Sequence, residues 1–283
     1  MGNGDSRLAG LLIATVVTTY LIVLLGIYTA ASGAGLTCEG RWPLCDGAVF
    51  GLFPANWPSF IEWFHRLVAM IGGFLIAGSA IATWRAGLSR PVVLPLTFAT
   101  LLLPLQIWIG GQTVLTYELL VLTSHFLVAL PIFGAVIIGI TWHFAPSRIS
   151  RHSLRRLFGG ALILVPMFWA IGPRMAFTHT PRIQVAYYAM GVLLLATMVM
   201  AVVLIIREGG HTVKHPQLLL ASCVVSIASL VIILLVGRLV YTTTLQLVDW
   251  GATALLFSCL VLAVGLLMLE ERGVQLTRSM SSN

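Results

Sequence analysis

The sequence predicts an all-α polytopic membrane protein with eight transmembrane helices, and two observations lead to this class. Of the 283 residues, 59% are hydrophobic and only 9% are charged. The mean hydropathy is +1.00, which is outside the range of soluble globular domains. Apolar runs of about 20 residues recur along the chain, and a helix of that length crosses about 30 Å of hydrocarbon.

The expected helices follow one another with short polar connections. They cover residues 8–31, 60–84, 91–113, 120–144, 155–175, 183–206, 217–240 and 247–270. The first run is too long for a signal peptide and lacks a small-residue cleavage site followed by a soluble domain, so we expect a retained helix. The lipid bilayer is therefore the main partner of the chain.

Basic residues predict how the helices are oriented, because they favour the cytoplasmic side. One set of connections, together with the two chain ends, carries Arg7, Arg85, Arg90, Arg148, Arg151, Arg155, Arg156, Arg207, Lys214, Arg272 and Arg278. The opposite connections carry only Arg41, Arg174 and Arg182. We expect both termini to be cytoplasmic. The charges are dispersed between helices and form no patch for nucleic acid.

A faint internal repeat predicts two pseudo-symmetric four-helix bundles, residues 1–147 and 148–283. The segment "EWFHRLVAMIGGFLI" aligns with "QVAYYAMGVLLLATM", and "SHFLVALPIF" aligns with "VDWGATALLF". In this alignment His65 corresponds to Tyr187, and His125 corresponds to Asp249. Only the first half therefore has histidines inside its helices.

His65 and His125 are the first candidate functional residues. Each is expected about six residues from the external end of its helix, so both lie at about 9 Å depth. Two imidazoles at one depth on two helices of a bundle can ligate a haem iron from both faces. The alternative for each is a packed histidine hydrogen-bonded to a neighbouring helix. Gly110 and Gly111 in "QIWIGGQTVLT" allow close approach of a helix or a macrocycle.

Glu62 and Arg66 flank His65 on the same helix. Glu62 shares a helical face with His65 and is a candidate catalytic acid or base. Alternatively, Ser59 and Glu62 form a capping box at the start of the helix. Arg66 is a candidate ligand for a haem propionate, or it extends toward the external headgroups.

Cys38 and Cys45 lie in the first external connection, "TCEGRWPLCDG". The spacing is too wide for a zinc or thioredoxin-type motif. An oxidising external face permits a disulfide between them, either as a structural link or as a redox-active pair beside the site. Cys223 and Cys259 lie in apolar runs and are expected to be packing residues.

Four segments together resemble the haem A synthase family: "GLTCEGRWPLCDG", "EWFHRLVA", "QIWIGGQTVLT" and "TSHFLVAL". The resemblance implies oxidation of the haem O methyl group to the formyl group of haem A, in support of cytochrome oxidase assembly. It implies that His65 and His125 ligate the substrate haem iron, that Glu62 is the essential carboxylate, and that the cysteines form the family's external pair. It also implies a multi-pass protein of a prokaryotic plasma membrane that works with a haem O synthase. A haem b is a further candidate cofactor, and homo-oligomerisation is left open.

The second half departs from the family pattern, which has two further histidines there for a haem b. Tyr187 and Asp249 take those places, so we expect no second-half haem b of the bis-histidine kind. Asp249 is alternatively a buried acid paired with Arg238 and hydrogen-bonded to Tyr187. Two other functions remain open, a non-catalytic haem-binding or haem-handling protein and a thiol–disulfide oxidoreductase that uses the cysteine pair.

Overall fold

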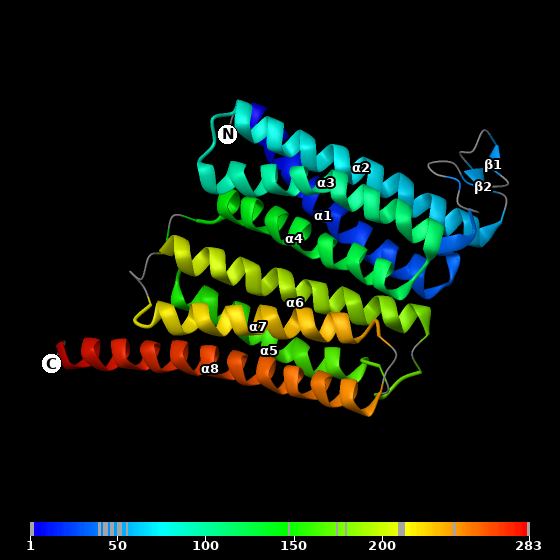
Figure 1. Cartoon of the computed structure of the whole chain (residues 1–283). Helices are drawn as coiled ribbons and strands as arrows, with labels where there is room; N and C mark the ends of the chain where they lie inside the picture. Colours follow the sequence, from blue (N-terminus) through cyan, green and yellow to red (C-terminus); the bar gives the residue numbers. More distant parts are fainter. Residues whose placement is uncertain are drawn as a thin grey trace. The chain divides into compact units, whose positions relative to one another are not determined.

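Eight long α-helices make up most of the described chain in the computed structural model (Figure 1). The structure describes all residues except 1–2, 39–40, 42–44, 46–47, 50–52, 55, 147, 174, 179, 209–212, 240–241 and 282–283. Arg174, His179 and His211 therefore lie outside the described residues. Within the described part, eight helices are long and apolar enough to cross a membrane, and the chain is a multi-pass membrane protein. The cytoplasmic location of the termini stays a prediction.

The helices lie close to the predicted positions. Their bounds are α1 Asn3–Ala31, α2 Trp57–Arg85, α3 Arg90–Thr116, α4 Leu119–Phe144, α5 Arg151–Ala170, α6 Pro181–Glu208, α7 Pro216–Val236 and α8 Thr243–Ser281. A 3₁₀ turn, Ala34–Leu36, follows α1, and a short antiparallel pair, β1 (Ala48–Val49) and β2 (Phe53–Pro54), precedes α2.

The start of α2 matters most for the site. Asn56 is its N-cap, and the Asn56 side chain accepts a hydrogen bond from the Ser59 backbone N–H at 2.9 Å. Pro58 lies in the first turn, where backbone N–H groups have no partner within the helix, so the proline costs no helical hydrogen bond. The capping box at Ser59 and Glu62 is therefore wrong, because the helix begins two residues before Ser59.

The chain divides into two compact units. Unit 1 comprises Met1–His143 and Thr178–Ala189, and unit 2 comprises Phe144–Phe177 and Met190–Asn283. The division passes through α6, whereas the sequence places the boundary at residue 147. The pseudo-symmetric relation of the two halves stays a prediction.

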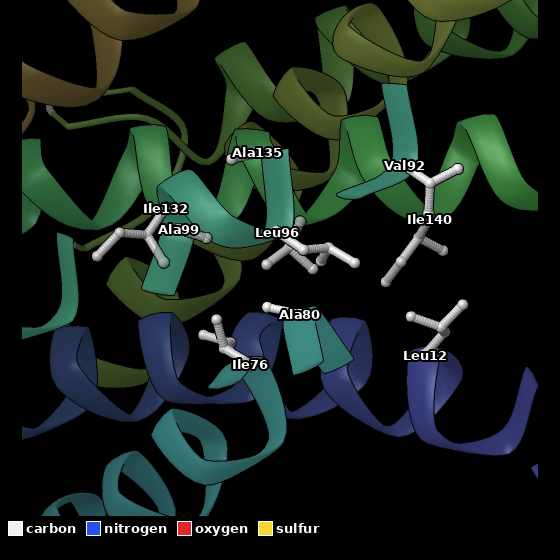
Figure 2. Close-up of a cluster of buried hydrophobic side chains, with 10 residues drawn as sticks. Leu12, Ile76, Ala80, Val92, Leu96, Ala99, Ile132, Ala135 and Ile140 are labelled. Carbon is white, nitrogen blue, oxygen red and sulfur yellow. The ribbon is translucent and has the colours of Figure 1, made fainter. Parts of the chain in front are cut away.

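Unit 1 has a core of small and branched apolar side chains in its first four helices. Figure 2 shows Leu12 of α1 and Ile76 of α2 on one side of this cluster, opposite Leu96 of α3 and Ile140 of α4. Leu96 is fully buried. Gly139 of α4 lets that helix approach α3 closely, because an added Cβ would lie 3.0 Å from the Leu96 side chain and from the Val92 carbonyl oxygen.

Unit 2 packs α8 against α5 and α7, and a carboxylate near the end of its last transmembrane span links three segments. Glu270 is buried and accepts backbone N–H bonds from Lys214 at 3.0 Å and His215 at 3.2 Å. Arg151 Nε lies 3.4 Å from the same carboxylate, and Arg155 pairs with the adjacent Glu271. These contacts tie the end of the α8 span to the beginnings of α5 and α7.

Candidate functional site

The site predicted in the first half is assembled within unit 1 from α1, α2, α3, α4 and the connection after α1. His65 lies eight residues after the start of α2, and His125 lies six residues after the start of α4. These positions are about 12 Å and about 9 Å along the helix axes. Both histidines lie in unit 1, and their pairing around one bound group stays a prediction.

Each imidazole packs against a glycine of another helix. A Cβ added at Gly26 of α1 would lie 3.1 Å from His65 Nε2. A Cβ added at Gly110 of α3 would lie 2.9 Å from His125 Cε1. No room for a larger side chain exists at Gly110 unless the ring moves, whereas the adjacent Gly111 has open space. Because glycine has no side chain, Gly26 and Gly110 leave the space that the two imidazole rings occupy.

Glu62 is held by the connection that carries the cysteines. Its side chain is buried, and its Oε2 accepts the Cys38 backbone N–H at 2.9 Å and the Thr37 hydroxyl at 3.4 Å. Its Oε1 pairs with Arg66, one turn later on α2. These contacts fix the carboxylate on the helical face that also carries His65. Because Asn56 is the helix cap, capping does not explain the position of Glu62, and its role as an acid or base stays a prediction.

Arg66 connects the helix to the same segment. Besides its pair with Glu62, the guanidinium donates from Nη1 to the Arg41 carbonyl oxygen at 2.6 Å. The Ser59 hydroxyl donates to the Thr37 carbonyl oxygen at 3.0 Å and makes a second attachment. Arg66 therefore anchors the connection, and its role toward a haem propionate stays a prediction.

Cys38 and Cys45 form the predicted disulfide, with a Cα–Cα distance of 4.4 Å. Both residues are buried and pack with Trp63 of α2, as do the partly buried Phe60 and Leu67. The bond lies next to the carboxylate, because the Cys38 backbone N–H donates to Glu62. The location of this connection on the external side of the membrane stays a prediction.

Gln106 of α3 is a part of the site that the sequence analysis did not single out. Its amide nitrogen lies 3.3 Å from His125 Nε2. Its Oε1 and the Thr123 hydroxyl are buried without a hydrogen-bond partner. Gln106 precedes Gly110 by one helical turn, so the two residues share a face of α3. This four-residue spacing from Gly110 was the sequence signal that could have placed Gln106 beside His125.

The second-half positions differ from the first. Tyr187 is buried in unit 1 and makes an edge-to-face contact with Tyr188, with ring centroids 5.2 Å apart. Asp249 is buried in unit 2. Helices α6, α7 and α8 contain no histidine. The pairing of Asp249 with Arg238 stays a prediction.

The donor set of unit 1 fits a haem better than a bare metal ion. Across the part of the chain that the structure describes, no three His, Cys, Asp or Glu side chains are grouped to hold a metal ion. Two imidazoles on separate helices suit the two axial positions of a haem iron. Gly26 and Gly110 leave room for the two imidazole rings, and the unbonded polar atoms of Gln106 and Thr123 are available to a bound group.

Eight helices that can cross a membrane, with two histidines and a buried carboxylate in the helices of unit 1, define a class of polytopic membrane protein. The chain belongs to the cytochrome oxidase assembly protein family, whose model matches residues 9–178. The sequence-based assignment to the haem A synthase family is confirmed by this match and by relatives of that name.

Relatives with two different names match this chain. A protoheme IX farnesyltransferase of Haloarcula marismortui is 34% identical over 134 residues, which is 47% of this chain and 28% of that protein. A heme A synthase of Bacillus licheniformis is 31% identical over 136 residues, covering 47% of this chain and 44% of that protein. A heme A synthase of Shouchella clausii is 38% identical over 85 residues, 30% of this chain and 27% of that protein. The chain thus spans less than half the length of these relatives.

Proposed function

We propose that this protein oxidises the methyl group of haem O to the formyl group of haem A. The observation that supports the proposal is the buried carboxylate of Glu62, which the Cys38 backbone N–H holds one helical turn before His65 in the unit that also contains His125. The heme A synthase relatives and the family match support a reaction on haem.

In this proposal His65 and His125 hold the substrate haem iron, and Glu62 moves a proton at the methyl carbon or its hydroxyl. Bound haem O supplies the iron centre and the methyl group. The conversion is two successive hydroxylations of the methyl carbon followed by loss of water, so it also consumes an external oxygen donor with its reducing equivalents. The contacts with Cys38 N–H and Arg66 keep the carboxylate in one orientation on the His65 face. The buried cluster of Cys38, Cys45 and Trp63 beside Glu62 would keep water away from the carboxylate.

The proposed partner is a protein that makes haem O, in a prokaryotic plasma membrane. Relatives named protoheme IX farnesyltransferase contain a segment similar to this chain within a longer polypeptide. In those relatives the similar segment and the named farnesyltransferase share one polypeptide. This favours transfer of farnesylated haem from the site that makes it to the site of the present chain. Farnesyl transfer itself is not proposed for this chain, because diphosphate-bound Mg²⁺ needs grouped carboxylates, and the described residues contain no such group.

A second candidate is a non-catalytic haem-binding protein. It is favoured by one observation, the lack of histidines in α6, α7 and α8, which removes the second-half haem b ligands expected for the family. A thiol–disulfide oxidoreductase is disfavoured. Both sulfur-bearing residues are buried, at 0% exposure for Cys38 and 4% for Cys45, and exchange requires access for an attacking thiolate.

The test is Glu62→Gln, co-expressed with a haem O source, with the bound porphyrins identified by mass. Glutamine can still accept the Cys38 and Thr37 hydrogen bonds but cannot act as an acid or base. We expect wild type to yield haem A, and the variant to bind haem O with turnover lower by about 10²- to 10⁴-fold.

Glu271→Gln is the matched control, because it removes an equivalent pair with Arg155 in unit 2. Haem A at the wild-type level in Glu62→Gln would remove the catalytic role of the carboxylate. Haem O that stays unmodified in wild type would favour the non-catalytic candidate.

A further inference from the structure

The connection between α3 and α4 contains a tyrosine in an uncommon backbone conformation. Tyr117 has a φ of 41°, and among the described residues it is the one non-glycine residue with a positive φ. A bulky side chain persists in this region only where its surroundings hold it there. The residue lies directly after α3 and two residues before the start of α4 at Leu119.

Tyr117 reaches from this connection to the end of α1 and to the turn that follows α1. Its hydroxyl donates to the Ala30 carbonyl oxygen at 3.2 Å. Its ring lies against Gly35, because a Cβ added at Gly35 would overlap the ring carbon Cε2. Gly35 is buried in the 3₁₀ turn, and this turn contacts α1, α2 and α3. The Tyr117 ring therefore occupies space that any other residue at position 35 would fill.

The same turn leads directly into the groups that hold Glu62. The Thr37 backbone N–H and hydroxyl bond to the Ala34 carbonyl oxygen at 3.2 Å and 2.8 Å. The next backbone N–H, that of Cys38, donates to the Glu62 carboxylate at 2.9 Å. Cys38 follows Gly35 by three residues, so a shift of the turn at Gly35 moves the donor that holds the carboxylate.

We propose that Tyr117 is a positioning residue for Glu62. It fixes the turn Ala34–Leu36 and, through this turn, the Cys38 N–H and the Thr37 hydroxyl that orient the carboxylate. The inference rests on the proposed function, in which Glu62 moves a proton during oxidation of haem O. The connection between α3 and α4 therefore takes part in setting the geometry at the start of α2.

The ring and the hydroxyl of Tyr117 can be tested separately. Tyr117→Phe removes the hydroxyl bond and keeps the ring, and a neutral hydrogen bond changes an equilibrium by a factor of about 2 to 12. Tyr117→Gly removes the ring as well, and glycine adopts a positive φ without strain, so the backbone of the connection is retained. Gly35→Ala perturbs the same contact from the other side, because the added methyl group displaces the ring.

Amide hydrogen exchange of residues 34–38, measured by mass spectrometry on the detergent-purified protein, tests the contact without haem. Exchange of these amides reports the local opening of the segment. We expect exchange in Tyr117→Phe to be faster than in wild type by about two- to twelvefold. In Tyr117→Gly and Gly35→Ala the increase should be larger, because the ring contact is lost or displaced.

Tyr20→Phe is the matched control. It removes a tyrosine hydroxyl that donates to the Ala189 carbonyl oxygen at 2.9 Å within the same unit. Tyr20 lies on α1 at about 15 Å along the helix from Ala30. The control should lower stability without changing the exchange of residues 34–38.

Haem O turnover, counted per haem-loaded molecule, tests the link to Glu62. In Tyr117→Gly we expect kcat to fall by about 10- to 100-fold, as for a reacting group displaced by about 1 Å, with KM for haem O within about twofold of wild type. Tyr117→Phe should keep most of the turnover, because its ring still fills the space beside Gly35. A purely structural role would lower the number of loaded molecules and leave their kcat unchanged.

Two results would overturn the inference alone: unchanged exchange of residues 34–38 in Tyr117→Gly and Gly35→Ala, or faster exchange with kcat at the wild-type value. If Tyr117→Gly does not fold, both measurements are made on Gly35→Ala. Wild-type protein that makes no haem A would overturn the proposed function, and the positioning role with it. The exchange measurement needs no haem, so the two failures are distinguished.

Discussion

Gly110→Ala, compared with Gly111→Ala, is the most direct test of how the glycines of α3 position His125. The added methyl group at Gly110 would lie 2.9 Å from His125 Cε1, a distance at which the ring must move. At Gly111 the same group meets nothing within 4 Å. The two variants share helix, residue type and depth, so they differ mainly in this contact.

The expected magnitudes follow from two opposing effects. Replacing glycine by alanine inside a helix stabilises it by about 1 kcal/mol, and this gain applies to both variants. Overpacking at Gly110 costs about 1–3 kcal/mol, so the two variants should differ in unfolding free energy by about that amount. For a chain of this size the difference corresponds to roughly 2–10 °C in Tm.

The assay is thermal unfolding of the detergent-purified protein, followed together with the haem absorption spectrum. Gly111→Ala should keep the wild-type spectrum and gain stability. Gly110→Ala should lose stability relative to Gly111→Ala and show a weakened low-spin haem signal. Equal Tm values and equal spectra for the two variants would refute the proposed contact between Gly110 and the imidazole.

Two further predictions concern the polar attachments of the helices. Cys38→Ser should lower the free energy of unfolding by about 2–3 kcal/mol, because it opens a loop of about eight residues, and it should weaken the contacts that hold Glu62. Cys259→Ser is the control, and urea unfolding with thiol labelling is used for both variants. Retained stability in Cys38→Ser would contradict the structural role of the bond. Glu270→Ala should lower the Tm more than Glu271→Ala, because Glu270 alone accepts two backbone N–H groups. An equal effect of both would show that the two backbone N–H bonds to Glu270 contribute little to stability.

The fold was predictable because a bilayer requires long apolar helices, and hydropathy reports them directly. The helix ends were less predictable, since they depend on capping residues. Helix α2 begins at Trp57 because Asn56 supplies the cap, and α5 begins at Arg151 because Ser150 accepts the Ser153 backbone N–H at 3.1 Å. A hydropathy average over a window of residues reveals neither capping residue.

The sequence indicates which candidate residues share a helix or a depth, and their function as one site stays a prediction. His65 and Glu62 lie three residues apart, and His125 lies at a similar depth on another helix. Gln106 and Gly26 were not predicted, because their place depends on the rotation of α3 and α1 about their axes. The partners of Glu62 were also missed, since the backbone of Cys38 reaches it from a connection without a regular pattern.

Electron paramagnetic resonance of the ferric, haem-loaded protein tests the central claim most directly. The account predicts a low-spin signal from two axial imidazoles in wild type, lost in His65→Ala and in His125→Ala. The signal should remain in His143→Ala, which changes a histidine at the other end of α4. A bis-imidazole low-spin signal that persists in the double variant, His65→Ala with His125→Ala, would contradict the assignment of the haem to this pair.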